Sequence, residues 1–148
     1  MLVPEDKILA LLPQRPPMVM VDSLVSCDEK ITVSLFTIKK GNIFLNENGF
    51  TASGMMETIA QTSAARIGFL LNKNSDGVNK RPPVGVIGSI KNFRLYFQPV
   101  AGSILTTTIE VGHEVLQATI IRGKVEVNGT VAAECDMQIF LTEEQPGS

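Results

Sequence analysis

The stretch SGMMETIAQTSAARIGFLL, residues 53–71, decides the fold class of this chain. Ser53 suits a helix N-cap, and the Asn-, Ser- and Gly-rich residues 72–77 end the helical pattern. Mostly small side chains share one face of this helix: Met56, Ala60, Ser63, Ala64 and Gly68. Small side chains let a helix axis lie close to its neighbours. This helix is therefore predicted to lie against a sheet that curls around it.

Extended segments surround the predicted helix on both sides. Four of them follow it and are rich in Val, Ile, Thr and Phe: residues 84–97, 103–111, 114–127 and 130–141. Turn signals join them at Pro99 to Gly102, Gly112 to Glu114 and Asn128-Gly129, of which the last is the strongest hairpin signal. Two more extended segments, residues 16–27 and 30–40, precede the helix, and a short helix opens at Pro4 and ends at Pro13. One long helix with five or six antiparallel strands predicts an α+β domain in which the sheet wraps the helix.

Length, charge and composition exclude several classes of function. The 148 residues are 44% hydrophobic, which suits one domain over residues 1–148. A net charge of −2 gives no sign of nucleic acid or of an anionic membrane as a partner. No apolar run is long enough to span a bilayer, and the acidic N-terminal residues do not resemble a secretory leader, so we expect a soluble, cytoplasmic protein. Cys27 and Cys135 are expected to be reduced, and without a metal-ligand cluster or a phosphate loop we expect no metal and no cofactor.

Four stretches together resemble the hotdog-fold 3-hydroxyacyl-acyl-carrier-protein dehydratases. LLPQRPPMVMVDSL, residues 11–24, is similar to that family's opening Leu-Pro-His-Arg-x-Pro segment, with Gln14 in place of the usual histidine. METIAQTSA, residues 56–64, resembles its active-site helix, with Glu57 at the position of the family's acid. Residues 85–105 and 124–141 are similar to its later strands. The similarity runs in order along nearly the whole chain and implies a hotdog fold.

The chain departs from that family where the catalytic base is expected. The family's histidine lies in a Gly-His-Phe-Pro segment before the helix, whereas this chain has NIFLNENGFTASG, residues 42–54, at that place. The single histidine, His113, lies far downstream in a predicted hairpin tip. A divergent branch associated with aryl-polyene-type pathways is similar in this respect, because it keeps the helix acid and lacks the histidine.

Glu57 is the candidate catalytic residue. Dehydration of a 3-hydroxyacyl thioester needs one group that removes the α-proton, another that protonates the departing hydroxyl, and donors that polarise the thioester carbonyl. Glu57 suits one of the two proton-transfer roles, while the amides of Gly54, Met55 and Met56 at the helix N-terminus suit the carbonyl. From the residues alone, an acid early in a helix is more often a complement to the helix dipole. The family resemblance favours the catalytic role.

The other polar candidates carry weaker signals. Gln61, one turn after Glu57, either lines the same channel or is a locally satisfied helix residue. Gln14 is a candidate for substrate binding or a turn residue, and its amide transfers no protons. Asp22 is expected to cap a turn or to pair with Arg15 rather than to act in chemistry.

Positive charge follows the helix at Lys80 and Arg81, with Lys91 and Arg94 beyond. An acyl carrier protein is acidic, so these side chains are candidates for docking it at the mouth of the channel. Solvated loop charges are an equally good interpretation.

The leading hypothesis is a dehydratase-like protein that acts on or binds acyl thioesters of acyl carrier protein or coenzyme A, in fatty-acid or polyene-type biosynthesis. Because the base is missing, we expect it to be catalytically degenerate on its own. Two alternatives stay open, a thioesterase that uses Glu57 and a non-catalytic partner subunit of an active dehydratase. We expect a homodimer, or a heterodimer with a second hotdog subunit, because pairing covers an exposed sheet edge.

Overall fold

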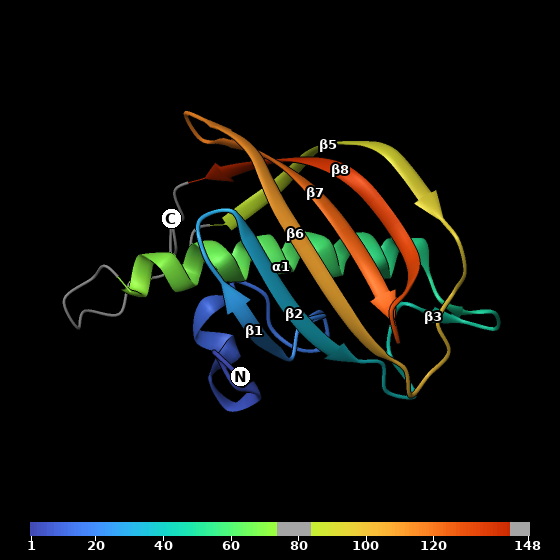
Figure 1. Ribbon diagram of the computed structural model, residues 1–148. Coiled ribbons are helices and arrows are strands. Elements are labelled where there is room, and N and C mark those ends of the chain that lie inside the picture. Colours follow the sequence, from blue (N-terminus) through green and yellow to red (C-terminus); the bar gives the residue numbers. More distant parts are fainter. Residues whose placement is uncertain (74–83, 143–148) are drawn as a thin grey trace.

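The structure is a computed structural model that describes residues 1–73 and 84–142. Within these residues, a six-stranded antiparallel sheet of order β1-β2-β6-β7-β8-β5 curls around one long helix, α1 (Ala52–Lys73) (Figure 1). The strands are β1 (Ser23–Cys27), β2 (Ile31–Thr37), β5 (Val84–Leu95), β6 (Ile104–Val115), β7 (Ala118–Val127) and β8 (Thr130–Thr142). The predicted α+β architecture, with the helix wrapped by the sheet, is confirmed.

The N-terminal residues form a 3-10 helix, η1 (Glu5–Leu11), which packs against a side of α1 that the sheet leaves open (Figure 1). Its end agrees with the stop predicted at Pro13. A short hairpin that was not predicted from the sequence precedes α1. It consists of two strands of two residues each, β3 (Leu45–Asn46) and β4 (Gly49–Phe50). The backbone N–H of Phe50 donates to the carbonyl oxygen of Pro99 at 2.7 Å, which ties this hairpin to the segment after β5.

The helix starts two residues earlier than predicted, at Ala52, because Thr51, not Ser53, caps it. The Thr51 hydroxyl oxygen accepts a hydrogen bond from the Gly54 N–H at 3.3 Å, and the Thr51 carbonyl oxygen accepts one from the Met55 N–H at 3.1 Å. The first bond satisfies a donor that a helix N-terminus otherwise leaves free, and the second is the first regular hydrogen bond of the helix. The cap also fixes the direction in which the chain enters the helix from β4.

One residue of the small face of the helix, Gly68, meets a different neighbour from the one predicted. A Cβ on Gly68 would lie 2.5 Å from the carbonyl oxygen of Leu11, so the glycine allows η1, rather than the sheet, to approach α1. Close approach to the sheet is instead provided by Gly123 of β7, where a Cβ would collide with the side chain of Ile59. The glycine that lets the helix lie close to the sheet is therefore on strand β7 and not on the helix.

We predict that Gly68→Ala lowers the free energy of unfolding by about 1–3 kcal/mol, because the new methyl group meets rigid backbone. The same substitution inside an unhindered helix usually stabilises by about 1 kcal/mol, so the sign itself is diagnostic. Gly112→Ala is the matched control, since its Cβ would meet its nearest atom at 3.4 Å. Urea unfolding of both variants measures the effect, and a stabilised Gly68→Ala would contradict the packing described here.

Of the three predicted turns, those at Pro99 to Gly102 and Asn128-Gly129 are confirmed and the third is wrong. Asn128 and Gly129 join β7 to β8 with φ angles of 51° and 82°, both in the left-handed region that a two-residue hairpin requires. The turn predicted at Gly112 to Glu114 is absent from the described structure, because β6 continues through these residues and pairs His113 with Ile120 across a bulge. The chain reverses later, at Leu116, whose φ is 57°.

Arg15 and Asp22 do not form the predicted pair with each other. The Arg15 guanidinium donates from Nη1 to the carbonyl oxygens of Leu9, Leu12 and Gln14, at 3.2, 2.8 and 2.7 Å. Asp22 instead accepts a hydrogen bond from the Thr37 N–H at 2.8 Å through Oδ2. Arg15 thus closes the end of η1, while Asp22 joins the start of β1 to the end of β2.

Burial raises the pKa of Asp22 above its ordinary value of 3.8, although the Thr37 N–H opposes this. A raised carboxyl pKa means that the folded chain binds the proton more tightly than the unfolded chain, so ionised Asp22 opposes folding above that pKa. We therefore expect Asp22→Asn to raise the melting temperature at pH 7, with a difference that shrinks as the pH falls toward 3.8. Thermal unfolding monitored by circular dichroism at several pH values measures this dependence.

Asp28→Asn is the matched control for Asp22→Asn. Hydrogen bonds from the N–H groups of Ile31 and Lys30, both at 2.7 Å, lower the pKa of Asp28. A carboxyl group whose pKa is lowered in the folded state stabilises that state at pH values above its ordinary pKa of 3.8. This stabilisation is lost as the pH falls. The control should therefore lower the melting temperature at pH 7. If both substitutions shifted the melting temperature at pH 7 in the same direction, the opposite pKa shifts of Asp22 and Asp28 would be contradicted.

Candidate functional site

Glu57 lies on the second turn of α1 at the wall of a cavity of about 210 Å³. The cavity lies between α1, the paired strands β5 and β8, and the segment that follows η1. Its lining is apolar apart from two side chains, Glu57 and Gln14, and the remaining wall consists of Ala60, Ala64, Ile67, Gly85, Ile87, Ile139 and Leu141. One acid in a small, mostly apolar cavity is the arrangement expected of a candidate active site.

Gln61 holds the Glu57 carboxylate in place. Its Nε2 donates to Glu57 Oε1 at 2.9 Å and to the carbonyl oxygen of Met18 at 2.8 Å, and its Oε1 accepts from the Met20 N–H at 2.6 Å. The side chain is fully buried. A glutamine amide offers two N–H groups and one oxygen, so every polar group of Gln61 is engaged. Gln61 therefore joins the acid to the segment before β1 rather than lying open to the cavity.

Gln14 shares the cavity with Glu57, as a joint site of these two residues requires. Among the described residues, none donates a hydrogen bond to its buried Oε1. Its backbone is fixed, because the Gln14 carbonyl oxygen accepts from Arg15 Nη1 at 2.7 Å. The structure thus brings together two candidates that are 43 positions apart in the sequence.

The amides expected to bind a thioester carbonyl lie at the N-terminus of α1. Gly54 is buried against the ring of Phe50 and the Cβ of Phe44, and a Cβ on Gly54 would lie 2.6 Å from the Phe50 ring. Met55 is fully buried, and Met56 is half-buried against the core. None of these three residues lines the Glu57 cavity in the described structure, and the Gly54 and Met55 N–H groups bond to Thr51.

The structure describes only two of the four basic side chains that were expected at the mouth of the channel. Lys80 and Arg81 lie outside the described residues. Lys91 and Arg94 pair in register with Asp136 and Glu134 of β8, on the face of the sheet turned away from α1. These two cations therefore do not border the Glu57 cavity.

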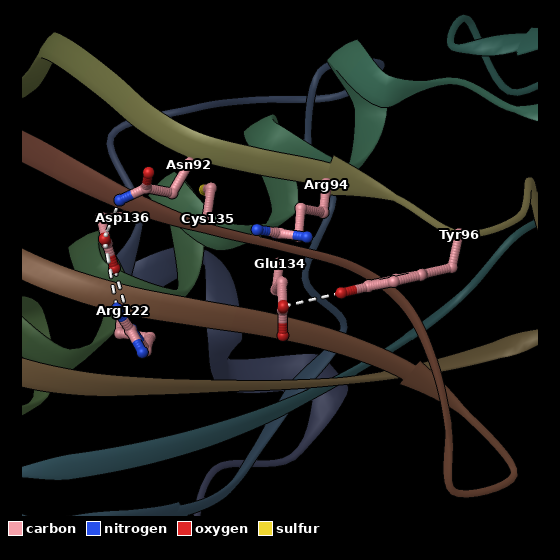
Figure 2. Close-up of a pocket in the computed structure, with 7 residues that line it drawn as sticks. All are labelled: Asn92, Arg94, Tyr96, Arg122, Glu134, Cys135 and Asp136. Carbon is pink, nitrogen blue, oxygen red and sulfur yellow. Dashed lines mark hydrogen bonds and ion pairs between the residues drawn. The ribbon is translucent and has the colours of Figure 1, made fainter.

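A second cavity, of about 360 Å³, lies on that outer face of the sheet (Figure 2). Arg122 donates to both carboxylate oxygens of Asp136 at 2.9 and 3.3 Å, and Asn92 donates to Oδ2 at 2.8 Å. The Arg122 guanidinium, with Asn92, holds the pKa of Asp136 below its ordinary range. Tyr96 donates to Glu134 at 2.8 Å at the other end of the cavity. These groups largely satisfy one another, as is usual for an exposed polar surface.

A third cavity, of about 440 Å³, lies between η1 and the end of β2. Its wall combines Ile8, Leu9 and Phe36 with the charged Asp22 and Lys39. Glu57 does not reach it, so its lining takes no part in the candidate site.

The single histidine is remote from Glu57. His113 is exposed on the outer face of the sheet, opposite Ile120 in the β6–β7 pairing. Within residues 1–73 and 84–142, no histidine therefore stands beside the acid. The described part of the chain also holds no group of three or more His, Cys, Asp or Glu side chains suited to a metal ion. None of its helices is long and apolar enough to cross a membrane.

The family model of the ApeP-like dehydratases matches residues 6–146 of this chain. No curated protein matches this chain. Among solved structures, the dehydratase heterocomplex ApeI:P from Xenorhabdus doucetiae superimposes with a TM-score of 0.77 at 16% identity, covering 93% of this chain and 91% of that one.

Two further solved structures share the architecture. A hypothetical thioesterase from Streptococcus pneumoniae, solved with coenzyme A, gives a TM-score of 0.62 at 12% identity, covering 82% of this chain and 86% of that one. The E. coli PaaI protein of the phenylacetic acid degradation operon gives 0.60 at 18% identity, covering 79% and 80%. At such identities these likenesses establish the fold, and the predicted hotdog fold is confirmed.

Proposed function

The chain belongs to the ApeP-like dehydratase family, and on that premise we propose that it is the acid-bearing subunit of a dehydratase for 3-hydroxyacyl thioesters. The observation that carries the proposal is the Glu57 carboxylate, which the buried Gln61 amide holds at the wall of a small apolar cavity. An acid fixed in this way is suited to one defined proton transfer.

The proposed reaction is an elimination of water. A base removes the proton from C2, and the electron pair of that C–H bond forms the C2–C3 double bond. The C3–O bond breaks, and the hydroxyl takes a proton from Glu57 and leaves as water. The products are an enoyl thioester and water. The base then releases the C2 proton to solvent and Glu57 takes one up from solvent, so no oxidant or cofactor is consumed.

We propose that the base is a histidine of a second hotdog subunit, which pairs with this chain along β5. Two observations support this position. β5 is a 12-residue edge strand with exposed apolar side chains at Val86, Ile87 and Leu95. The opposite edge strand, β1, is shorter and is partly covered by the bridge from Val3. β5 also borders the Glu57 cavity, so a subunit paired along it lies close to the acid.

The substrate is proposed to arrive as a thioester of acyl carrier protein or of coenzyme A in the cytoplasm. Lys80 and Arg81 are proposed to dock the acidic carrier protein. The Gly54, Met55 and Met56 amides are retained as proposed partners of the thioester carbonyl. This role requires the substrate to approach the N-terminal turn of α1, where the Gly54 N–H bonds to the Thr51 side chain and the Met55 N–H bonds to the Thr51 carbonyl oxygen.

A thioesterase is the second candidate. It needs Glu57 to activate water and requires no histidine, which fits the histidine-free surroundings of Glu57 in the described residues. The coenzyme A bound in the structure of the hypothetical Streptococcus pneumoniae thioesterase supports thioester chemistry on this fold. A non-catalytic partner subunit is the remaining alternative from the sequence, and the fixed position of Glu57 disfavours it.

The test uses the full chain with 3-hydroxyacyl-acyl carrier protein, alone and mixed with a hotdog protein that retains the Gly-His-Phe-Pro histidine. Mass spectrometry follows the enoyl product and the free thiol. We expect no enoyl product from the chain alone, and a higher rate of enoyl formation in the mixture than with the histidine-bearing protein alone. Free thiol from the chain alone would establish the thioesterase, and no rate increase in the mixture would refute the acid-bearing role.

A further inference from the structure

The cavity between η1 and the end of β2 is separate from the Glu57 cavity and, at about 440 Å³, is the larger of the two. Its volume lies in the range of about 300–1,000 Å³ that small-molecule sites occupy. Leu9, Pro17 and Val19 line it with apolar surface that is exposed or half-buried, and the buried Phe36 lies in the same wall. The cavity is therefore suited to a small ligand with an apolar body.

Two lysine side chains line this cavity and are available to a ligand. Lys39 and Lys40 are neighbours in the sequence, and both are exposed. Within residues 1–73 and 84–142, neither ammonium group forms an ion pair with a carboxylate. A ligand carboxylate placed between them gains charge-assisted hydrogen bonds that no protein group supplies. The lysines therefore offer a site for a negative group.

Asp22 and Glu5 bring negative charge to the same cavity. Asp22 Oδ2 accepts a hydrogen bond from the Thr37 N–H at 2.8 Å, whereas Oδ1 keeps exposed surface and has no donor among the described residues. Burial raises the pKa of Asp22, the Thr37 N–H opposes this rise, the charge of Glu5 adds to it and the charge of Lys39 counters it. A ligand ammonium group at Asp22 offsets the repulsion from Glu5.

The ligand that matches this lining carries both charges on an apolar body. An apolar carboxylate without an amine would meet the repulsion of Asp22 and Glu5, and an apolar amine without a carboxylate would meet that of the lysines. A free α-amino acid carries an ammonium group and a carboxylate on one carbon atom. A large apolar side chain on that carbon matches the apolar part of the wall.

The wall of this cavity is tied to the candidate acid through one residue, Val19. Its two neighbours in the chain both bond to Gln61, because Gln61 Nε2 donates to the Met18 carbonyl oxygen at 2.8 Å and Gln61 Oε1 accepts from the Met20 N–H at 2.6 Å. Gln61 Nε2 also donates to Glu57 Oε1 at 2.9 Å. A ligand packed on Val19 therefore restrains the segment that holds Gln61 and, through it, Glu57.

We propose that the cavity between η1 and the end of β2 is a regulatory site for a free α-amino acid with a large apolar side chain. Its carboxylate pairs with Lys39 and Lys40, and its ammonium group pairs with Asp22. The bound amino acid holds Val19 in place and so stabilises the hydrogen bonds that Gln61 makes. This site is distinct from the Glu57 cavity, so the inference does not depend on the reaction proposed above.

The first experiment measures binding to the full chain by isothermal titration calorimetry with three probes. L-phenylalanine carries both charges, N-acetyl-L-phenylalanine lacks the ammonium group, and phenethylamine lacks the carboxylate. We expect L-phenylalanine to bind with a dissociation constant below about 1 mM, and each of the other probes to bind roughly tenfold or more weakly. Absence of L-phenylalanine binding up to about 10 mM, or equal binding of either other probe, would overturn the proposal.

Lys39→Gln and Asp22→Asn locate the site, and each should weaken L-phenylalanine binding roughly fivefold or more. Because Asp22→Asn is expected to raise the melting temperature, weaker binding to this variant is not a consequence of unfolding. Lys30→Gln and Asp28→Asn are the matched controls, since both residues lie at the exposed β1–β2 turn and do not line the cavity. Unchanged affinity in both Lys39→Gln and Asp22→Asn would overturn the assignment of the site.

Hydrogen exchange measured by NMR tests the link to Gln61 without an activity assay. L-phenylalanine at about ten times its dissociation constant should slow exchange of the Met20 N–H about tenfold, because the segment then opens only after the ligand leaves. Exchange of the Lys30 N–H, which bonds to Asp28 Oδ1 at the exposed turn, should stay unchanged. Unchanged Met20 exchange in the saturated protein would overturn the regulatory role.

Discussion

Glu57→Gln is expected to lower the rate of enoyl formation by the two-subunit mixture by roughly 10²–10⁴-fold, the range typical of losing one general acid. Glutamine has nearly the same shape as glutamate, and its side-chain oxygen still accepts the hydrogen bond from Gln61 Nε2. What it loses is the transferable proton. The measurement is the initial rate of enoyl product, together with the melting temperature of the variant.

The control for Glu57→Gln is Glu134→Gln, which changes a carboxylate on the outer face of the sheet that bonds Tyr96. It should leave the rate unchanged within a factor of two. If Glu57→Gln keeps its melting temperature and its rate, Glu57 is not the acid. If activity resides in a thioesterase instead, Glu57→Gln should abolish release of free thiol, so the two candidate functions stay distinguishable.

Gln61→Met is expected to lower the free energy of unfolding by about 2–4 kcal/mol, because it leaves one buried and one part-buried backbone group without a protein partner. Those groups are the Met20 N–H and the Met18 carbonyl oxygen, which the glutamine amide contacts at 2.6 and 2.8 Å. Methionine has a similar length, so the loss reflects hydrogen bonding more than packing. Urea unfolding followed by circular dichroism measures it.

Gln138→Met is the matched substitution for Gln61→Met. Gln138 lies on β8, and its Oε1 accepts from Ser89 Oγ at 3.3 Å on the partly exposed outer face. Its replacement should change the unfolding free energy by less than about 0.5 kcal/mol. Comparable losses from the two variants would mean that Gln61 does not join α1 to the Met18–Met20 segment.

Features set by neighbouring residues were predictable from the sequence. The Asn128-Gly129 hairpin follows from the left-handed backbone that those two residues adopt readily. The long helix follows from its composition, although its cap moved from Ser53 to Thr51, since both residue types suit that position. Glu57 and Gln61 lie one turn apart on any helix, so their mutual contact was also within reach of sequence spacing.

Features that depend on distant residues were not predictable. The Gly112 to Glu114 turn was misplaced because a bulge opposite Ile120 lets β6 continue, and no local signal marks the bulge. The small face of α1 was predicted from spacing, but only packing decided that Gly68 meets Leu11. His113 was predicted to lie at a hairpin tip. It is instead an exposed residue of β6, within the segment where that turn was wrongly predicted.

The amino-acid sequence by itself determined the long helix, the strands of the main sheet and the family, and it pointed to Glu57 as the candidate acid, because periodicity, turn chemistry and motif order are local properties of the chain. The tertiary structure alone decided that Gln61 is buried against Met18 and Met20, and that Gln14 shares a cavity with Glu57. Those pairs are separated by about 40 positions, so they meet only when η1 and the following segment dock on α1. A hydrogen bond or a shared cavity between such residues requires the long-range packing that no local pattern encodes.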